Sequence, residues 1–327
     1  MKSYRIIFLI IFICACSQIA TYGSTRTLPQ TGIKAVEASP GVRILYAVGP
    51  DKPVVLSGSD YALEVFEASV SDGVLRILSK TDPNEINMEE EDFLEVTISA
   101  PNISKFKIGR ESRLVCSGKL ILDRPFELEL GSNSSALFAD IQAANINLNL
   151  SSHTITALGN IYTDGDFTLH AKEFTIIEAN EIKAAGVVKS FQNHNSIFTV
   201  KGVLTSGEGG ATLGNRAQFS ATSWTSIGTV SLHAADSAII NIEFTSGTSL
   251  KINLGAKGIA HIADCTNRTI YAEGSSGSLI HLCNINADSI MAKTDKGQIV
   301  LTGQAKFGAI TSDNGIIPQK NFKIVTN

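Results

Sequence analysis

Residues 269–288 read TIYAEGSSGSLIHLCNINAD, and residues 289–308 read SIMAKTDKGQIVLTGQAKFG. The two segments share few identical residues, but their apolar residues fall at matching places. The matched pairs are Ile270 with Ile290, Ala272 with Ala292, Leu279 with Ile299, and Ile280 with Val300. A chain that returns to the same apolar positions at a fixed period is built from a structural repeat.

The twenty-residue period extends on both sides of this segment. Three series follow it: Val230, Leu250, Ile270, Ile290 and Ile310; Ile239, Ile259, Leu279 and Ile299; and Ile240, Ala260, Ile280 and Val300. At about 3.3 Å per strand residue, twenty residues hold two or three short strands and their corners, with no room for a useful helix. A β-sandwich with strands every 8–12 residues would not need this register. We therefore predict an all-β parallel β-helix (solenoid) with about 20 residues per turn, because one turn cannot bury its apolar face alone.

The composition restricts the classes of function. The chain has 327 residues, 43% of them hydrophobic, and a formal net charge of -4. This length is ample for one large or two medium domains. Charged residues make up 18% of the chain, below the usual ~25%. No stripe of Lys and Arg could neutralise a run of phosphates, so we expect no nucleic-acid partner.

The first 23 residues, MKSYRIIFLIIFICACSQIATYG, have the pattern of a signal peptide. Lys2 and Arg5 precede an apolar run that is too short to span a membrane. Two processing routes are open: the segment before Cys16 resembles a lipoprotein signal, in which Cys16 is lipidated, and ordinary signal peptidase could cut near Gly23. Contact with a membrane is expected only through such an N-terminal lipid anchor.

The rest of the chain divides into two parts. Residues 24–40 are polar and lack periodicity, so we predict a tether there. Residues 41–327 show short runs of alternating apolar and polar residues, as in FELEL at 126–130, and form the predicted β-helix domain.

Candidate catalytic and metal-ligating residues are few. His261 and His281 are twenty residues apart and should stack on adjacent turns, where two imidazoles could bind a metal. Position 241 is Asn and position 301 is Leu, so a third ligand is lacking from this series, and we expect a polar ladder with no metal and no cofactor. Cys116, Cys265 and Cys283 form no disulfide framework, and Cys265 and Cys283 are expected to pack as two small buried hydrophobes.

Polysaccharide lyases and hydrolases also use the β-helix fold, so the carboxylates need to be examined. Glycoside hydrolysis requires two carboxyl groups within roughly 5–10 Å of each other. The residues whose clustering would favour an enzyme are Asp140, Asp164, Asp166 and Glu178. Their spacing is typical of solvated corners, and we predict no catalytic residue.

Two segments resemble a known family. Residues 70–77, VSDGVLRI, match its "v-x-D-G-x-L-x-I" segment, and residues 98–103, ISAPNI, match its "v-x-x-P-x-l" segment. The family is the "putative autotransporter adhesin, head GIN domain", which is typical of the Bacteroidetes. The resemblance covers about residues 35–225 and implies a right-handed parallel β-helix at the cell surface or in the periplasm, with no catalytic residue. The turns from 226 to 327 look like more of the same solenoid.

If the chain has that origin, a modification signal becomes relevant. The triplets at Ser237 (Asp-Ser-Ala) and Ser289 (Asp-Ser-Ile) resemble the short O-glycosylation signal of the Bacteroidetes. Both serines are therefore candidate O-glycosylation sites.

These observations predict an exported, non-enzymatic protein of the cell envelope. It would be an adhesin-like scaffold that presents one β-helix face to a glycan or to a cell-surface protein. The location would be the outer membrane as a lipoprotein, the cell surface or the periplasm. The alternatives are a β-helix carbohydrate-active enzyme and a structural envelope component without a small ligand. The ligand and the oligomeric state stay open at this level.

Overall fold

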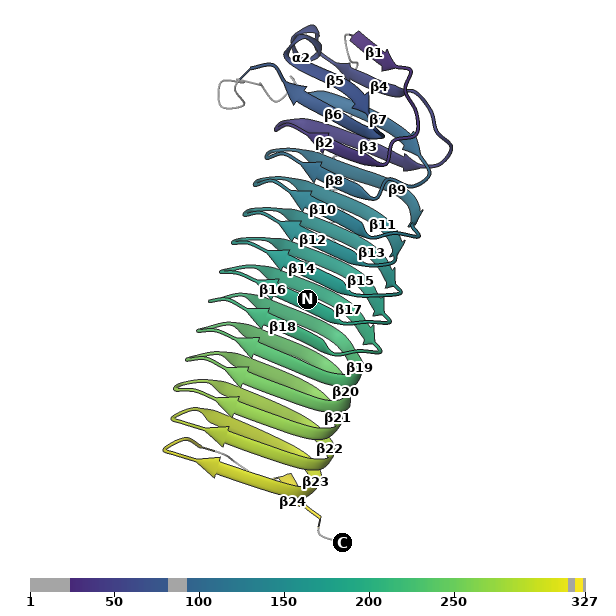
Figure 1. Cartoon of the computed structure of the whole chain (residues 1–327). Coiled ribbons are helices and arrows are strands. Elements are labelled where there is room, and N and C mark those ends of the chain that lie inside the picture. Colours follow the sequence, from purple (N-terminus) through teal and green to yellow (C-terminus); the bar gives the residue numbers. More distant parts are fainter. Residues whose placement is uncertain (1–23, 82–92, 317–320, 326–327) are drawn as a thin grey trace.

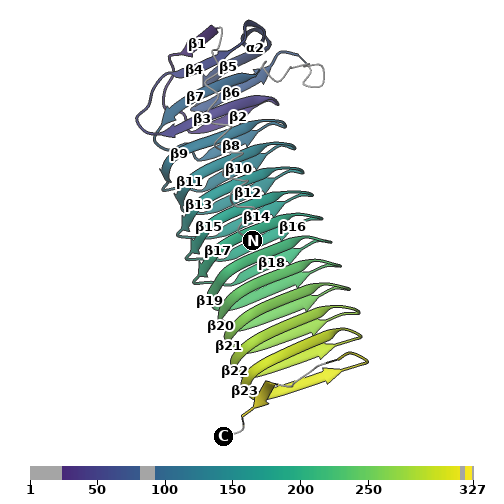
Figure 2. The same cartoon turned by 180° about the vertical axis from the view of Figure 1, so that it is seen from behind.

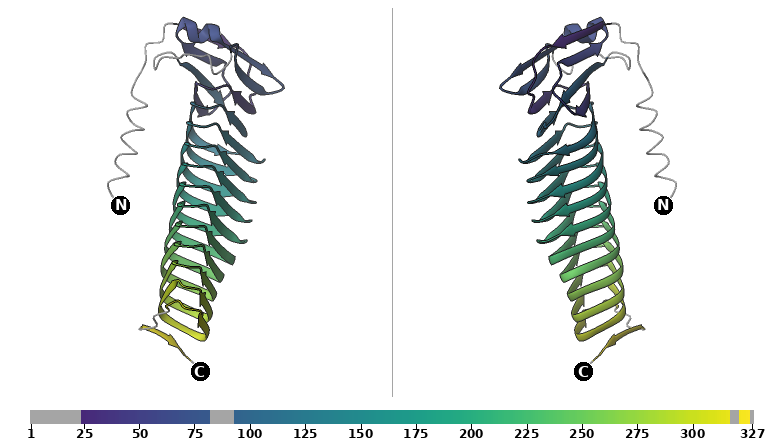
Figure 3. Two further views of the ribbon diagram at one scale, coloured as in Figure 1. Left: turned by 90° about the vertical axis from the view of Figure 1, so that its left-hand side faces the viewer. Right: turned by 90° about the vertical axis from the view of Figure 1, so that its right-hand side faces the viewer.

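The structure, a computed structural model, describes residues 24–81, 93–316 and 321–325. The chain winds into a parallel β-solenoid of about 10 turns with roughly 21 residues per turn (Figure 1). The same stack of turns is seen from behind in Figure 2, and the side views in Figure 3 show it as a narrow column. The predicted parallel β-helix is thus confirmed, with a period slightly longer than twenty residues.

Each middle turn supplies one long bent strand and one short strand. The long strands are β9 (Arg113–Ile121), β11 (Ser135–Ala143), β13 (Ile155–Thr163), β15 (Ile176–Ala184) and β17 (Ile197–Thr205). The short strands are β8 (Lys105–Ile108), β10 (Phe126–Leu130), β12 (Ile146–Leu150), β14 (Phe167–Ala171), β16 (Val188–Gln192) and β18 (Gly209–Leu213). Long strands pair with long strands and short with short, in parallel register.

In the later turns the long and short strands merge into one. These strands are β19 (Gln218–Ala234), β20 (Ile239–Leu254), β21 (Ile259–Gly274), β22 (Leu279–Thr294) and β23 (Gln298–Ser312), followed by the short β24 (Asn321–Ile324). The regular turns predicted to continue past residue 226 are therefore present.

The core is a set of inward ladders. In β10 the exposure alternates between buried and half-buried residues, as period-two side-chain direction requires. Three phenylalanines, Phe106, Phe126 and Phe138, pack together near the start of the column with ring centroids 5.3 to 6.2 Å apart. Of the two adjacent apolar series in the later turns, Ile240, Ala260 and Ile280 of one are fully buried, whereas Ile259 of the other is 38% exposed. In the last turn the roles are exchanged, with Ile299 buried and Val300 half-buried.

One corner of the solenoid repeats the same backbone conformation. The residue there has a φ between 54° and 70° in ten successive turns: Glu111, Asn133, His153, Phe174, Asn195, Arg216, Ser237, Lys257, Gly277 and Lys296. In the first nine of these turns its backbone N–H donates to a carbonyl of the next turn, as from Asn195 to Asn215 at 3.0 Å. The corner therefore satisfies backbone groups by hydrogen bonds between turns.

The register of the last full turn departs from the sequence alignment. Ile270 pairs with Ile290 and Ala272 with Ala292, as predicted. The next step pairs Leu279 with Gln298, Ile280 with Ile299, Ile290 with Gly308 and Ala292 with Ile310. The predicted matches of Leu279 with Ile299, Ile280 with Val300 and Ile290 with Ile310 are therefore wrong by one or two residues.

The shift arises in two steps. Leu279 already pairs one residue short of the twenty-residue spacing, with Gln298, and a local irregularity in β22 adds the second residue. The ladder between β22 and β23 changes register between Leu282 and Ile285. Asn284, inside that interval, has a φ of 47°, and its backbone N–H donates to Thr302 Oγ1 at 3.1 Å. An extra residue accommodated in one strand shortens the spacing to its partner on the next turn.

A mixed sheet covers the N-terminal end of the column (Figure 1). It contains β1 (Ser24–Leu28), β2 (Ala35–Ala38), β3 (Val42–Val48), β4 (Val54–Gly58), β5 (Phe66–Ser71), β6 (Val74–Ser79) and β7 (Leu94–Ala100). The short helix α2 (Asp60–Val65) lies between β4 and β5 in the chain. The pairs β1–β4, β4–β7 and β5–β6 are antiparallel. Ser59 caps α2, its Oγ accepting from the backbone N–H of Ala62 at 3.1 Å.

The prediction of a tether at residues 24–40 is wrong, because this segment is part of the folded N-terminal end. It contains β1, which pairs with β4, and β2, which pairs with β6 and β8. Backbone pairing needs no apolar side chains, so the polar β1 gave no periodic signal. Ile33 and Val36 are the buried anchors of this segment, at 2% and 0% exposure.

The predicted signal peptide, including Cys16, lies outside the described residues. Within the described ranges, no helix is long and apolar enough to cross a membrane.

Candidate functional site

A groove of about 780 Å³ runs along the outer face of the solenoid. It crosses seven neighbouring long strands of the stack, β11, β13, β15, β17, β19, β20 and β21. Because stacked strands are about 4.8 Å apart, the groove is about 30 Å long. Its first row consists of register-paired outward residues: Leu137, Ala157, Glu178, Thr199, Ser220, Asn241 and His261. Its second row lies two residues further along each strand: Asn180, Lys201, Thr222, Glu243 and Ala263.

The groove follows the bend of the long strands. In β15 two successive residues, Asn180 and Glu181, are both half-buried, which interrupts the alternation. Gly159 occupies this place in β13, where a Cβ atom would lie less than 2 Å from the backbone oxygen of Ala139, so only glycine fits. Asn180 Nδ2 donates to Asn160 Oδ1 at 2.6 Å, which ties the bends of successive turns together.

The groove changes character along its length. At the β11 end it is apolar, with Leu137 and Ala157, and toward β21 it becomes polar, with Ser220 and Asn241. Its charged residues are two carboxylates, Glu178 and Glu243, and one amine, Lys201. Opposite charges of similar number leave a weak net potential, which suits an uncharged ligand better than a polyanion.

The carboxylates of the groove are too far apart for glycoside hydrolysis. Glu178 and Glu243 lie on β15 and β20, three strand steps apart, which is about 14 Å against the roughly 5–10 Å that the reaction needs. Of the four carboxylates singled out in the sequence, Glu178 is the one that lines the groove. Asp140 accepts from Asn160 N and Nδ2 at 2.8 and 3.1 Å, and Asp166 accepts from the backbone of Val187 at 2.7 Å.

The β21 end of the groove holds the stacked histidines. His261 pairs with His281 in register, and their ring centroids are 4.9 Å apart. The sequence offered no third side chain that could ligate a metal here, but the structure places Cys283 beside the pair, with its Sγ 3.2 Å from Nε2 of His281. Burial, and then the neighbouring His261, lower the pKa of His281. Sequence reasoning missed Cys283 because it looked only at twenty-residue spacings, whereas residues i and i+2 of a strand also share a face.

The three cysteines divide into two kinds. Cys265 is buried, as predicted, and Cys116 is buried as well. Burial raises the pKa of Cys116 to about 12. Cys283 is half-buried on the outer face, so its prediction as a buried thiol is wrong.

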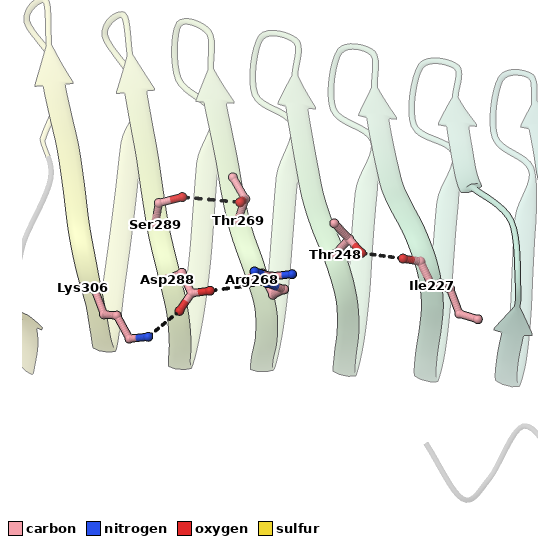
Figure 4. A network of polar contacts seen from close by, with 7 residues as sticks. All are labelled: Ile227, Thr248, Arg268, Thr269, Asp288, Ser289 and Lys306. Carbon is pink, nitrogen blue, oxygen red and sulfur yellow. Dashed lines mark hydrogen bonds and ion pairs between the residues drawn. The ribbon is translucent and has the colours of Figure 1, made fainter.

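A second, smaller pocket of about 460 Å³ lies near the C-terminal end. Asp288 is its centre, with Lys306 Nζ at 2.8 Å and Arg268 Nε at 3.4 Å (Figure 4). Lys306, and to a lesser degree Arg268, lower the pKa of Asp288. All three side chains are well exposed, and exposed ion pairs contribute little to stability.

The two candidate glycosylation sites differ in setting. Ser237 is half-buried at the positive-φ corner, next to the exposed Asp236. Ser289 lies within β22, and its Oγ donates to Thr269 Oγ1 at 3.4 Å (Figure 4). A corner is more accessible to a modifying enzyme than the middle of a strand, so Ser237 is the better candidate of the two.

The fold and the groove define a parallel β-solenoid with a grooved outer face. Residues 33–188 match the family model described as "Putative auto-transporter adhesin, head GIN domain", which confirms the resemblance seen in the sequence over a shorter range than predicted. No curated protein matches the chain.

The chain is similar to several solved structures, among them three putative adhesins. The crystal structure of a putative adhesin from Bacteroides fragilis NCTC 9343 is 15% identical, covers 68% of this chain and 96% of its own, and has a TM-score of 0.49. A putative adhesin from Parabacteroides distasonis ATCC 8503 is 12% identical, with coverages of 92% and 94% and a TM-score of 0.40. One from Parabacteroides merdae ATCC 43184 is 12% identical, with coverages of 90% and 94% and a TM-score of 0.35.

Proposed function

We propose that the protein is a non-enzymatic binding scaffold of the cell envelope whose groove holds an extended, uncharged, hydroxyl-rich polymer such as a glycan. The groove itself carries this proposal. From β15 to β20 it presents a side-chain hydroxyl or amide on each long strand, on Asn180, Thr199, Ser220, Thr222 and Asn241. A polymer whose units repeat along its length can meet such a row with the same kind of hydrogen bond many times over.

Export is part of the proposal. It is supported by the leader-like composition of residues 1–23 and by the adhesin description of the matching family. Lipidation at Cys16 and cleavage near Gly23 are its two routes, and the mass of the mature N-terminus in the native host distinguishes them. A mature chain that still carries residues 1–16 would contradict both.

The absence of catalysis is proposed on geometry. A hydrolase would need two carboxyl groups on either side of one glycosidic bond. The groove instead separates Glu178 from Glu243 by about 14 Å, three strand spacings. A protein ligand in place of a glycan is the alternative occupant that the experiment below distinguishes.

The test is a glycan-array screen of the full chain, followed by titration calorimetry on each hit. Ser220→Trp places a bulky side chain in the middle of the groove, and we expect it to weaken binding at least about tenfold. Thr212→Trp is the matched control, because Thr212 points outward from β18, on a different part of the surface.

Each outcome has a distinct meaning. Equal binding by both variants would place the ligand outside the groove and overturn the proposal. Release of shortened sugars from any hit would overturn the non-enzymatic part. An array without hits, together with a protein captured from the cell surface by the wild type but not by Ser220→Trp, would replace the glycan with a protein ligand.

A further inference from the structure

Three side chains with soft or borderline donor atoms converge where the groove meets β22. They are His261 on β21 and His281 and Cys283 on β22, all half-buried. Their ligand atoms all lie within 4.8 Å of one another. In a tetrahedral zinc site with bonds of about 2.0–2.3 Å, neighbouring ligand atoms are about 3.3–3.6 Å apart. Small side-chain rotations therefore suffice to bring the three onto one ion.

We propose that His261, His281 and Cys283 bind one Zn²⁺ ion, with the fourth coordination position open toward the groove. Two imidazoles and one thiolate suit a borderline ion such as Zn²⁺. Ca²⁺ and Mg²⁺ are excluded as occupants because they require oxygen ligands. Three protein ligands with one open position are also the arrangement in which zinc accepts a group from a bound molecule.

The solenoid places the three ligands. Parallel register puts His281 directly beside His261, one strand spacing away. Cys283 shares the outward face with His281 because it lies two residues further along β22. The site ends at these two strands, since Asn241 precedes His261 in the ladder and Val300 follows His281.

Hydrogen bonds of the next residue, Asn284, fix the backbone around Cys283. Asn284 breaks the strand with a φ of 47°, its N–H donates to Thr302 Oγ1, and its Nδ2 donates to Asp264 Oδ1 at 2.8 Å. The irregularity thus has partners on both adjacent turns. Strand irregularities of this kind commonly re-aim a side chain next to a functional site.

Cysteine and histidine side chains elsewhere in the solenoid lie away from this cluster. Cys116 and Cys265 are buried in the core and cannot reach a surface ion. His233 is exposed on β19, where its ladder neighbours are Thr212 and Asn253. It therefore serves as the control for histidine loss without loss of the cluster.

The experiment is zinc titration of the full chain by calorimetry after chelator treatment. Each variant carries a residue already found at the equivalent place on a neighbouring turn: His261→Asn copies Asn241, His281→Val copies Val300, and Cys283→Ala copies Ala263. We expect one equivalent of Zn²⁺ in the wild type and at least about tenfold weaker binding in each variant. His233→Ala should bind as the wild type does.

Cobalt provides a second readout that a merely structural role would not change. Co²⁺ in the wild type should show the visible bands of a tetrahedral site and a thiolate charge-transfer band. Cys283→Ala should lose the charge-transfer band while its circular dichroism stays unchanged. Zinc affinity that survives Cys283→Ala, or that falls equally in His233→Ala, would overturn the proposal, and so would a wild type that shows no saturable binding.

Discussion

The indole of Trp224 occupies the space that a side chain at position 209 would need. A Cβ atom on Gly209 would lie 2.6 Å from Nε1 of Trp224. Gly209 belongs to the inward ladder that continues through Val230 and Leu250, where its neighbours carry branched side chains. Trp224 is 1% exposed and is the largest side chain of the core. The pair therefore keeps the volume of this turn close to that of the others.

We expect Gly209→Ala to destabilise the protein by about 1–3 kcal/mol, because it overpacks a filled core. Thermal and urea unfolding midpoints measure this. Gly202→Ala is the control: Gly202 also lies in a strand, but its Cβ would meet nothing nearer than Ser223 Oγ at 3.4 Å. Trp224→Phe should recover part of the loss in the Gly209→Ala background. Equal midpoints for Gly209→Ala and Gly202→Ala would contradict this packing.

The solenoid itself could be predicted because its cause is periodic. Ile270 and Ile290 must both face the core, and twenty-residue spacing of such residues has one simple geometric explanation. The further change of register between Leu282 and Ile285 had no such signal. Asn284 is an ordinary polar residue in the sequence, and its left-handed backbone depends on contacts with Thr302 and Asp264 on other turns.

The groove and the cluster at its end were hidden for a similar reason. The bend at Gly159 forms part of a groove only when successive turns stack their bends on one another. The sequence of a single repeat therefore does not predict the groove. His261 and His281 were found because they obey the period. Cys283 was missed as a ligand because its relation to them combines one strand step with a two-residue step along the strand.

A reciprocal pair of substitutions tests the positive-φ corner. Gly277 has a φ of 70° and Lys257, one turn earlier, has a φ of 57°. Left-handed backbone costs a non-glycine residue roughly 1–2 kcal/mol. We expect Gly277→Ala to lower the free energy of unfolding by about 1 kcal/mol and Lys257→Gly to raise it by about 1 kcal/mol. The thermal unfolding midpoint should move in the same direction in each variant. If both substitutions changed the stability in the same direction, the left-handed backbone conformation would not be what decides their effect.

The pH dependence of Asp288 follows from its two cationic neighbours. Its pKa is lowered by Lys306 and then by Arg268. A carboxyl group whose folded pKa is depressed stabilises the fold above its unfolded pKa, and this stabilisation is lost as pH falls through the folded value. Carbon-detected NMR titration should therefore give a midpoint below the ordinary ~3.9 of aspartate.

The charge variants give this titration its control. Lys306→Ala should raise the midpoint of Asp288 more than Arg268→Ala does, because Lys306 makes the shorter contact, 2.8 Å against 3.4 Å. Lys296→Ala removes the same charge from a corner residue and should leave the midpoint unchanged. A midpoint that does not respond to Lys306→Ala would show that the ion pair is absent in solution.

The C-terminal edge of the column carries the last prediction. β24 pairs with residues 302–305 of β23, and Phe322 is buried against the last turn at 8% exposure. Open β-edges pair readily with other chains, so we expect removal of residues 321–327 to produce oligomers or aggregates. Light scattering coupled to size-exclusion chromatography measures this. Phe322→Ala, which keeps the backbone pairs of β24, should aggregate less than the truncation does. A truncated protein with the elution volume and mass of the wild type would mean that β24 does not protect this edge.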